Sequence, residues 1–120
     1  MNRILVRDFP DQQFGTIING RRVTFRFRYN VSTDRWTFDL SVDDLPILHG
    51  RKIVGGTDLM APFRRNLRHQ FRFEIGYLVA VPITKGAVPD RQSLPNGEYR
   101  IYHLSNEEAD SFNLVSFLFR

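Results

Sequence analysis

The side chains that most often carry chemistry are few in this sequence and widely spaced. Its three histidines, His49, His69 and His103, lie far apart and no cysteine is present, so the ligand spacing of a zinc site is missing. The acidic pairs Asp43-Asp44 and Glu107-Glu108 fall in a turn and a linker, which favours solvated charges over a general acid and base. The sequence also lacks a nucleophile elbow and a phosphate-binding glycine loop. We therefore predict no enzyme, no metal site and no cofactor.

A cluster of basic residues is the first candidate for function. The stretch from Leu59 to Phe73 contains no acidic residue. On a helical turn Arg64, Arg65 and Arg68 would lie opposite Phe63 and Leu67 and present a cationic patch. Such a patch suits an acidic partner protein, the phosphates of a nucleic acid, or water alone, and we favour the partner protein. The cluster consists of Arg64, Arg65, Arg68, His69 and Arg72.

The C-terminal segment is the second candidate. Residues 105–120 are expected to form an extension, and its part from Phe112 to Phe119 is apolar on both faces. Such a strand is either central between two layers or an edge that pairs with another chain. We favour a docking strand, with Phe112, Leu114, Phe117 and Phe119 as its contact residues.

Two successive hairpins over residues 13–42 give the clearest indication of the fold that positions these candidates. Asn19-Gly20 is a strong two-residue turn, because both residues tolerate the positive φ of a type I′ turn. Apolar and polar side chains then alternate with the period of a strand that is buried on one face. The buried side would carry Val23, Phe25, Phe27 and Tyr29, and the exposed side Thr24, Arg26 and Arg28.

The register of the return strand follows from a turn at Ser32-Thr33. A slip of one residue would move every apolar side chain to the wrong face. On the polar face this register places Arg26 opposite Asp39 and Arg22 opposite Asp43, charge pairs worth roughly 0.2–1 kcal/mol each. The apolar pairs are Tyr29 with Trp36, Phe27 with Phe38, Phe25 with Leu40 and Val23 with Val42.

The rest of the chain reads as further short strands. We expect a strand pair over 47–54 around His49-Gly50, strands over 71–83 and 98–104, and a loop or short helix near 57–70. Roughly seven short strands with frequent turns predict an all-β fold, a small antiparallel barrel or sandwich. Residues 1–104 would form a single β domain.

Composition narrows the class of protein. The 120 residues include 15 arginines, 2 lysines and 13 acids, for a net charge of +4. Guanidinium groups pair with carboxylates and phosphates in a bidentate manner, so this bias favours binding to a macromolecule. The absence of cysteine suits an intracellular or intravirion setting. Since no signal peptide or membrane-length apolar run is present, we expect a soluble protein with no membrane partner.

The order of turns and strands resembles the baseplate plug family of small proteins from contractile-tailed bacteriophages. The likeness spans roughly residues 9–104. The loop from Pro62 to Arg72 and the tail from Ser105 to Arg120 are longer than the family pattern. The matching motifs are Asn19-Gly20, Arg26 to Asn30, Arg35 to Leu40, Pro46 to Gly50, Ile53 to Leu59 and Pro95 to Leu104.

The resemblance implies a structural component of a phage tail baseplate, located in the virion and in the host cytoplasm during assembly. Hub, tube or tail-cap proteins would be its partners, with several copies in a ring and no catalytic residues. A nucleic-acid-binding small barrel is the alternative, with Phe25, Phe27, Tyr29 and Trp36 as stacking platforms. The register argues against it, because these aromatics face the core. A ligand-binding barrel would need inward polar groups that the sequence lacks.

Overall fold

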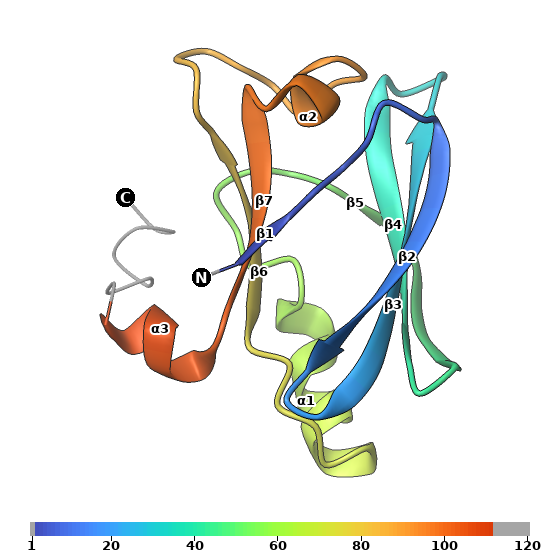
Figure 1. Ribbon diagram of the computed structural model, residues 1–120, viewed down its shortest axis with the longest axis vertical. Coiled ribbons are helices and arrows are strands. Elements are labelled where there is room, and N and C mark those ends of the chain that lie inside the picture. Colours follow the sequence, from blue (N-terminus) through green and yellow to red (C-terminus); the bar gives the residue numbers. More distant parts are fainter. Residues whose placement is uncertain (1, 112–120) are drawn as a thin grey trace.

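The computed structural model describes residues 2–111, which form two antiparallel sheets and three short helices (Figure 1). One sheet has the order β2-β3-β4-β5 and the other β1-β7-β6. The sheets face each other as in a sandwich and do not close into a barrel over the described residues, so the all-β prediction is confirmed. The strands are β1 (Asn2–Ile4), β2 (Asp11–Ile18), β3 (Arg21–Asn30), β4 (Arg35–Val42), β5 (Leu45–Lys52), β6 (Tyr77–Pro82) and β7 (Tyr99–Leu104), and the helices are α1 (Ala61–Gln70), α2 (Ser93–Asn96) and α3 (Asn106–Ser111).

The four-stranded sheet is built from hairpins whose turns use positive φ angles. Asn19 and Gly20 have φ of 48° and 77°, as a type I′ turn requires. Asp43 and Asp44 also have positive φ, 50° and 66°, at the turn between β4 and β5. Each of the four apolar pairs expected between β3 and β4 is present, so the predicted register is confirmed.

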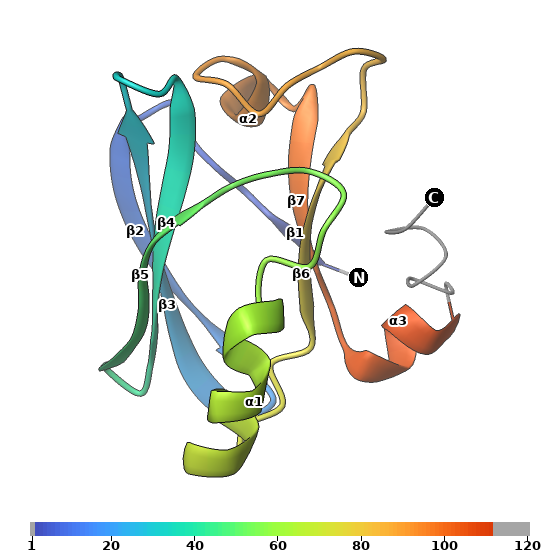
Figure 2. The same cartoon turned by 180° about the vertical axis from the view of Figure 1, so that it is seen from behind.

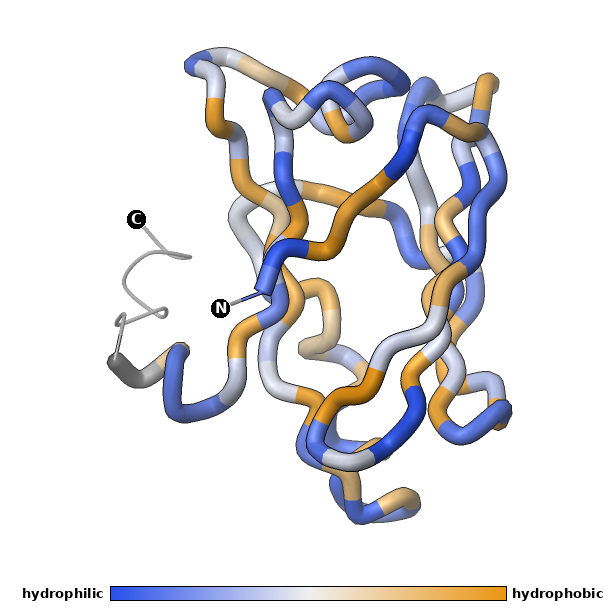
Figure 3. Tube along the Cα trace, in the orientation of Figure 1, coloured by the Kyte–Doolittle hydropathy of each residue, from blue (hydrophilic) through white to orange (hydrophobic). Residues whose placement is uncertain are grey.

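The core lies between the two sheets. The aromatic side chains of β3 and β4 fill its centre, where Phe25 and Phe27 stack with their centroids 5.9 Å apart. Leu78 and Ile101 cover them from the three-stranded sheet. Apolar residues, orange in Figure 3, occur along both sheets and along the N-terminal segment that runs between them. Burial of each large apolar side chain stabilises the fold by about 1.5–3 kcal/mol.

Helix α1 closes one end of the sandwich, beside the lower ends of the two sheets in Figure 2. A proline starts its first turn, where a missing N–H costs no hydrogen bond. Leu67 is fully buried, and its carbonyl accepts hydrogen bonds from the amides of Phe71 and Phe73, which ends the helix. The short helix expected near 57–70 is therefore present.

Two predicted strands differ from the structure. The strand expected over 71–83 begins only at Tyr77, because Arg72 and Gly76 have φ of 50° and 81°, outside the strand region. Phe73 and Ile75 are nevertheless buried, so their alternation reflects packing of an irregular segment. The pair of short strands expected around His49-Gly50 is instead one strand, β5, which continues through an irregular register with β4.

The predicted C-terminal extension, residues 105–120, contains a helix near its start. Residues 106–110 were expected to be an acidic link, but α3 covers them. Ser105 Oγ accepts from the Glu108 amide and Glu108 Oε1 accepts from the Ser105 amide, both at 3.1 Å. This reciprocal capping box was readable in the sequence Ser-x-x-Glu. The predicted docking residues Phe112, Leu114, Phe117 and Phe119 lie outside the described residues.

Candidate protein interface

Arg64, the first arginine of the basic cluster, is held inside the molecule. Its Nη2 donates to the carboxylate of Asp58 and, at 2.8 Å, to the Gly76 carbonyl oxygen. Its guanidinium carbon lies 4.1 Å from the centroid of the Tyr77 ring, within reach of a cation–π interaction. Only 19% of the side chain is exposed. Arg64 therefore fixes α1 against the start of β6.

Arg68 pairs with the acid that follows the cluster. Its Nε and Nη2 donate to the two carboxylate oxygens of Glu74 at 2.7 and 3.2 Å. These bonds, with one from the Asn106 amide group, lower the pKa of Glu74 and raise that of Arg68. Through the bonds that Glu74 accepts from Arg68 and Asn106, α1 is connected to the beginning of α3.

We expect the free energy of unfolding to fall as the pH drops below about 4.5, the ordinary pKa of a glutamate. Glu74, Asp43 and Asp90 have lowered pKa values because Arg68, Arg21 and the Ser93 amide, respectively, donate hydrogen bonds to them. Such groups stabilise the folded state above their unfolded pKa, and this stability is lost as the pH falls through the folded pKa. Urea unfolding at several pH values should show that the free energy of unfolding depends less on pH in the Glu74→Gln variant than in the wild type. The same pH dependence in both proteins would contradict a stabilising role for the Glu74 carboxylate.

Arg65 and Arg72 are the members of the cluster that face solvent without an ion pair among the described residues. His69 is also exposed, in the last turn of α1. The preceding hairpin holds this end of the molecule in place, since Arg21 Nη1 donates to the Phe71 carbonyl oxygen at 2.8 Å. Of the basic residues that the sequence grouped, Arg64 and Arg68 are paired with acids, and Arg65 and Arg72 carry the charges that no described acid pairs.

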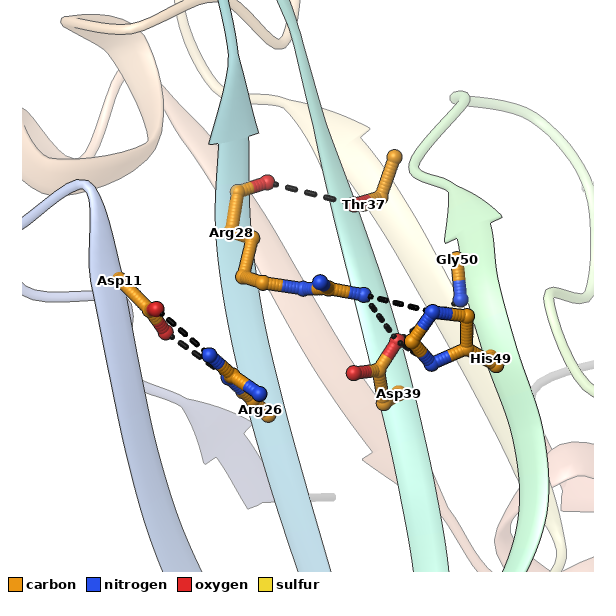
Figure 4. A network of polar contacts seen from close by, with 7 residues as sticks. All are labelled: Asp11, Arg26, Arg28, Thr37, Asp39, His49 and Gly50. Carbon is orange, nitrogen blue, oxygen red and sulfur yellow. Dashed lines mark hydrogen bonds and ion pairs between the residues drawn. The ribbon is translucent and has the colours of Figure 1, made fainter.

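A second polar surface covers the outer face of the four-stranded sheet (Figure 4). Arg26 lies opposite Asp39 in the register, as predicted, but it bonds both carboxylate oxygens of Asp11, at 3.0 and 2.7 Å. Asp39 instead accepts from Arg28 at 2.9 Å and lies 3.2 Å from His49 Nδ1. The predicted Arg26–Asp39 ion pair was therefore wrong, because the pairs form diagonally across the strands. Arg26, Arg28, Asp11 and Asp39 are therefore paired with one another on this face.

A groove that the sequence did not indicate lies beside β2. It has a volume of about 860 Å³ and runs between β2 and the N-terminal segment that includes β1. Leu5 and Phe9 line it and are 51% and 59% exposed. A smaller hollow of about 230 Å³ lies near the end of β2 and is bordered by Ser105 and Glu108. The available signal was the absence of charged residues from 12–18 of β2, next to apolar residues 4–6.

The comparison with protein families now decides what kind of protein carries these surfaces. A family model described as "Cyanophage baseplate Pam3 plug gp18" matches residues 1–107. The chain belongs to this baseplate plug family. The match includes both sheets and ends inside α3, so residues 108–120 lie beyond it. No curated protein sequence matches the chain.

The features of this baseplate plug protein do not favour nucleic-acid binding through stacked bases. Of the four suggested platforms, Phe25, Phe27 and Trp36 are at most 1% exposed. Tyr29 is half-buried, and Arg91 lies over both its ring and that of Trp36. Over residues 2–111, no three His, Asp or Glu side chains gather closely enough to hold a metal ion. None of the described helices has the length and apolar character needed to cross a membrane.

Proposed function

We propose that the chain is a structural component of a contractile phage tail baseplate, held in the virion by contacts with hub, tube or tail-cap proteins after assembly in the host cytoplasm. Membership of the plug family carries this proposal. The arginine-rich surface supports it, since arginine is enriched where proteins meet. Several copies would form a ring, because head-to-tail contacts close when their rotation permits.

Two elements of the chain would make these contacts. The first is the basic cluster, in which Arg65 and Arg72 would pair with acidic side chains of a neighbour while Arg64 and Arg68 hold the surrounding backbone in place. The second is the C-terminal segment. Its apolar residues Phe112, Leu114, Phe117 and Phe119 would supply buried contact area.

Reversing the two exposed charges tests the role of the cluster. Quantitative mass spectrometry of purified tails should find the wild-type chain at a fixed stoichiometry. The double variant Arg65→Glu/Arg72→Glu should be reduced by about tenfold or more, because placing like charges together costs several kcal/mol. Its thermal unfolding should match that of the wild type, since neither side chain has an ion pair among the described residues.

The matched control is Lys52→Glu/Lys85→Glu, which changes the net charge equally at exposed positions outside α1 and the loop after it. Tails should incorporate this control at the wild-type level. Absence of the wild-type chain from purified tails would reject the baseplate role. Normal incorporation of the Arg65→Glu/Arg72→Glu variant would reject the cluster as a docking element while leaving that role intact.

A further inference from the structure

The outer edge of β2 carries backbone groups with no partner. β2 is the first strand of its sheet and pairs on one side only, with β3. Ile18 and Arg21 flank a two-residue turn and so form a hydrogen-bonded pair, and such pairs alternate along an antiparallel ladder. The N–H and C=O groups of Gln13, Gly15 and Ile17 therefore point away from β3. Within residues 2–111 no other backbone group bonds them.

This edge also lacks the usual protection against strand addition. Natural edge strands are short, or carry lysine, proline or a bulge. β2 is eight residues long and has Asp11 at its start as its one charged residue. The outer edge of β6, by contrast, is covered, since the amides of Gly56 and Leu59 donate to Ala80 and Leu78.

The core is incomplete beside β2. Phe14 stacks on Phe25 at 5.5 Å between centroids, yet it is only half-buried, whereas Phe25 is 1% exposed. The groove of about 860 Å³ lies against this side of Phe14, and its other wall includes the exposed side chains of Leu5 and Phe9. In Figure 1 the N-terminal segment crosses from the three-stranded sheet to the start of β2. An added strand would cover apolar surface on both walls of the groove and form hydrogen bonds with the outward N–H and C=O groups of β2.

The chain itself contains a segment that suits this groove. Phe112 to Phe119 has eight residues, the length of β2, and no charged residue or proline. Because it is apolar on both faces, one face could complete the core beside Phe14 while the other covers the N-terminal segment. Added strands gain affinity from main-chain hydrogen bonds and specificity from alternate side chains.

The position of α3 favours exchange between copies. α3 ends at Ser111 on the side of the three-stranded sheet that faces away from β2, as both Figure 1 and Figure 2 show. The described chain therefore ends on the side of the three-stranded sheet opposite β2, whereas Glu108 near the start of α3 borders the smaller hollow at the end of β2. We propose that residues 112–120 of a second copy enter the groove and add to β2 as a strand. The proposal rests on the proposed assembly of several copies, and its head-to-tail contact is of the kind that closes into a ring.

Cross-linking of full-length chains tests this contact, since the natural sequence has no cysteine. Chains with Gln13→Cys are mixed with chains with Ser116→Cys and treated with a short bismaleimide. Cross-linked dimers should form between the two variants. Mixing Lys85→Cys with Ser116→Cys should give none, because Lys85 lies in the loop between β6 and α2, away from the groove.

A blocked edge provides the matched control. Two substitutions at Gly15, to proline and to alanine, are each added to the Gln13→Cys chain. Gly15→Pro removes one outward N–H and should lower the cross-linked fraction by about tenfold. This is the change in affinity expected when one hydrogen bond is lost whose net free energy lies at the upper end of the usual range. Gly15→Ala keeps that N–H and should cross-link normally, since its Cβ would meet no atom closer than 3.9 Å. Circular dichroism would verify that both variants fold.

Three outcomes would overturn the proposal. No cross-link between copies would do so, as would equal cross-linking of the Gly15→Pro chain in its folded form. A cross-link confined to single chains that carry both cysteines would show that the segment occupies its own groove. Failure of the chain to enter tails would reject the baseplate role without affecting these measurements, so the two proposals can fail separately.

Discussion

Replacing Asp58 with alanine is expected to lower the free energy of unfolding by about 3–5 kcal/mol, the usual effect of removing one partner of a buried ion pair. The side chains of Asp58 and Arg64 are 7% and 19% exposed. Asp58 Oδ1 also accepts from the amides of Met60 and Leu78 at 3.1 and 3.2 Å. The substitution would leave the guanidinium group without its counter-ion and both amides without this acceptor.

Urea unfolding followed by circular dichroism measures this loss. Asp11→Ala is the control, because Asp11 and its partner Arg26 are 52% and 44% exposed and water screens their interaction. This variant should lose far less stability. Replacing both Asp58 and Arg64 with leucine should restore part of the stability, since no buried charge then lacks a partner. Equal losses for Asp58→Ala and Asp11→Ala would contradict the structural role of the pair.

The two hairpins were predictable because several local rules agree there. Asn19-Gly20 defines the first turn, and a single register of the next two strands places their large apolar side chains on one face and Arg22, Arg26 and Arg28 on the other. The second turn contains Ser32 and Thr33, as expected, and Asp34 with φ of 52° completes it. Neighbouring strands in the sequence pair in space here, so short-range patterns sufficed.

The basic cluster shows where a sequence window misleads. The stretch Leu59 to Phe73 has no acid, but the two residues that border it are Asp58 and Glu74. These acids are the partners of Arg64 and Arg68 in the structure. The charge count inside the stretch therefore overstated the free positive charge. Extending the window by one residue on each side would have indicated the two ion pairs.

Long-range pairing accounts for most of what the sequence did not reveal. β1 pairs with β7 about one hundred residues later, with Asn2 opposite His103, and no local pattern specifies such a contact. The segment before Tyr77 alternates like a strand, yet positive φ at Arg72 and Gly76 prevents one. A side chain at Gly76 would lie 2.3 Å from the Leu104 carbonyl oxygen, a close approach that depends on the final packing. The groove beside β2 arises from the same long-range arrangement.

Replacing Trp36 with alanine is expected to cost about 3–5 kcal/mol of the free energy of unfolding, as is typical for a fully buried tryptophan. Trp36 is 0% exposed, and its ring meets that of Tyr29 in an edge-to-face arrangement with 5.6 Å between ring centroids. Arg91 lies 5.5 Å from the Trp36 ring centroid, and Trp36 Nε1 donates to the Asp90 carbonyl oxygen at 2.9 Å. The side chain thus joins β4 to the loop before α2, so its loss would affect both the core and that loop.

Trp36→Phe separates the two contributions. Phenylalanine keeps most of the buried ring but leaves the Asp90 carbonyl oxygen without its donor, which costs about 1–3 kcal/mol. Thermal unfolding by far-ultraviolet circular dichroism is the suitable measurement, because Trp36 is the only tryptophan and its fluorescence disappears in both variants. The alanine variant should be clearly less stable than the phenylalanine variant. If the two lose equal stability, the hydrogen bond to Asp90 and not the packing of the ring holds this part of the sandwich together.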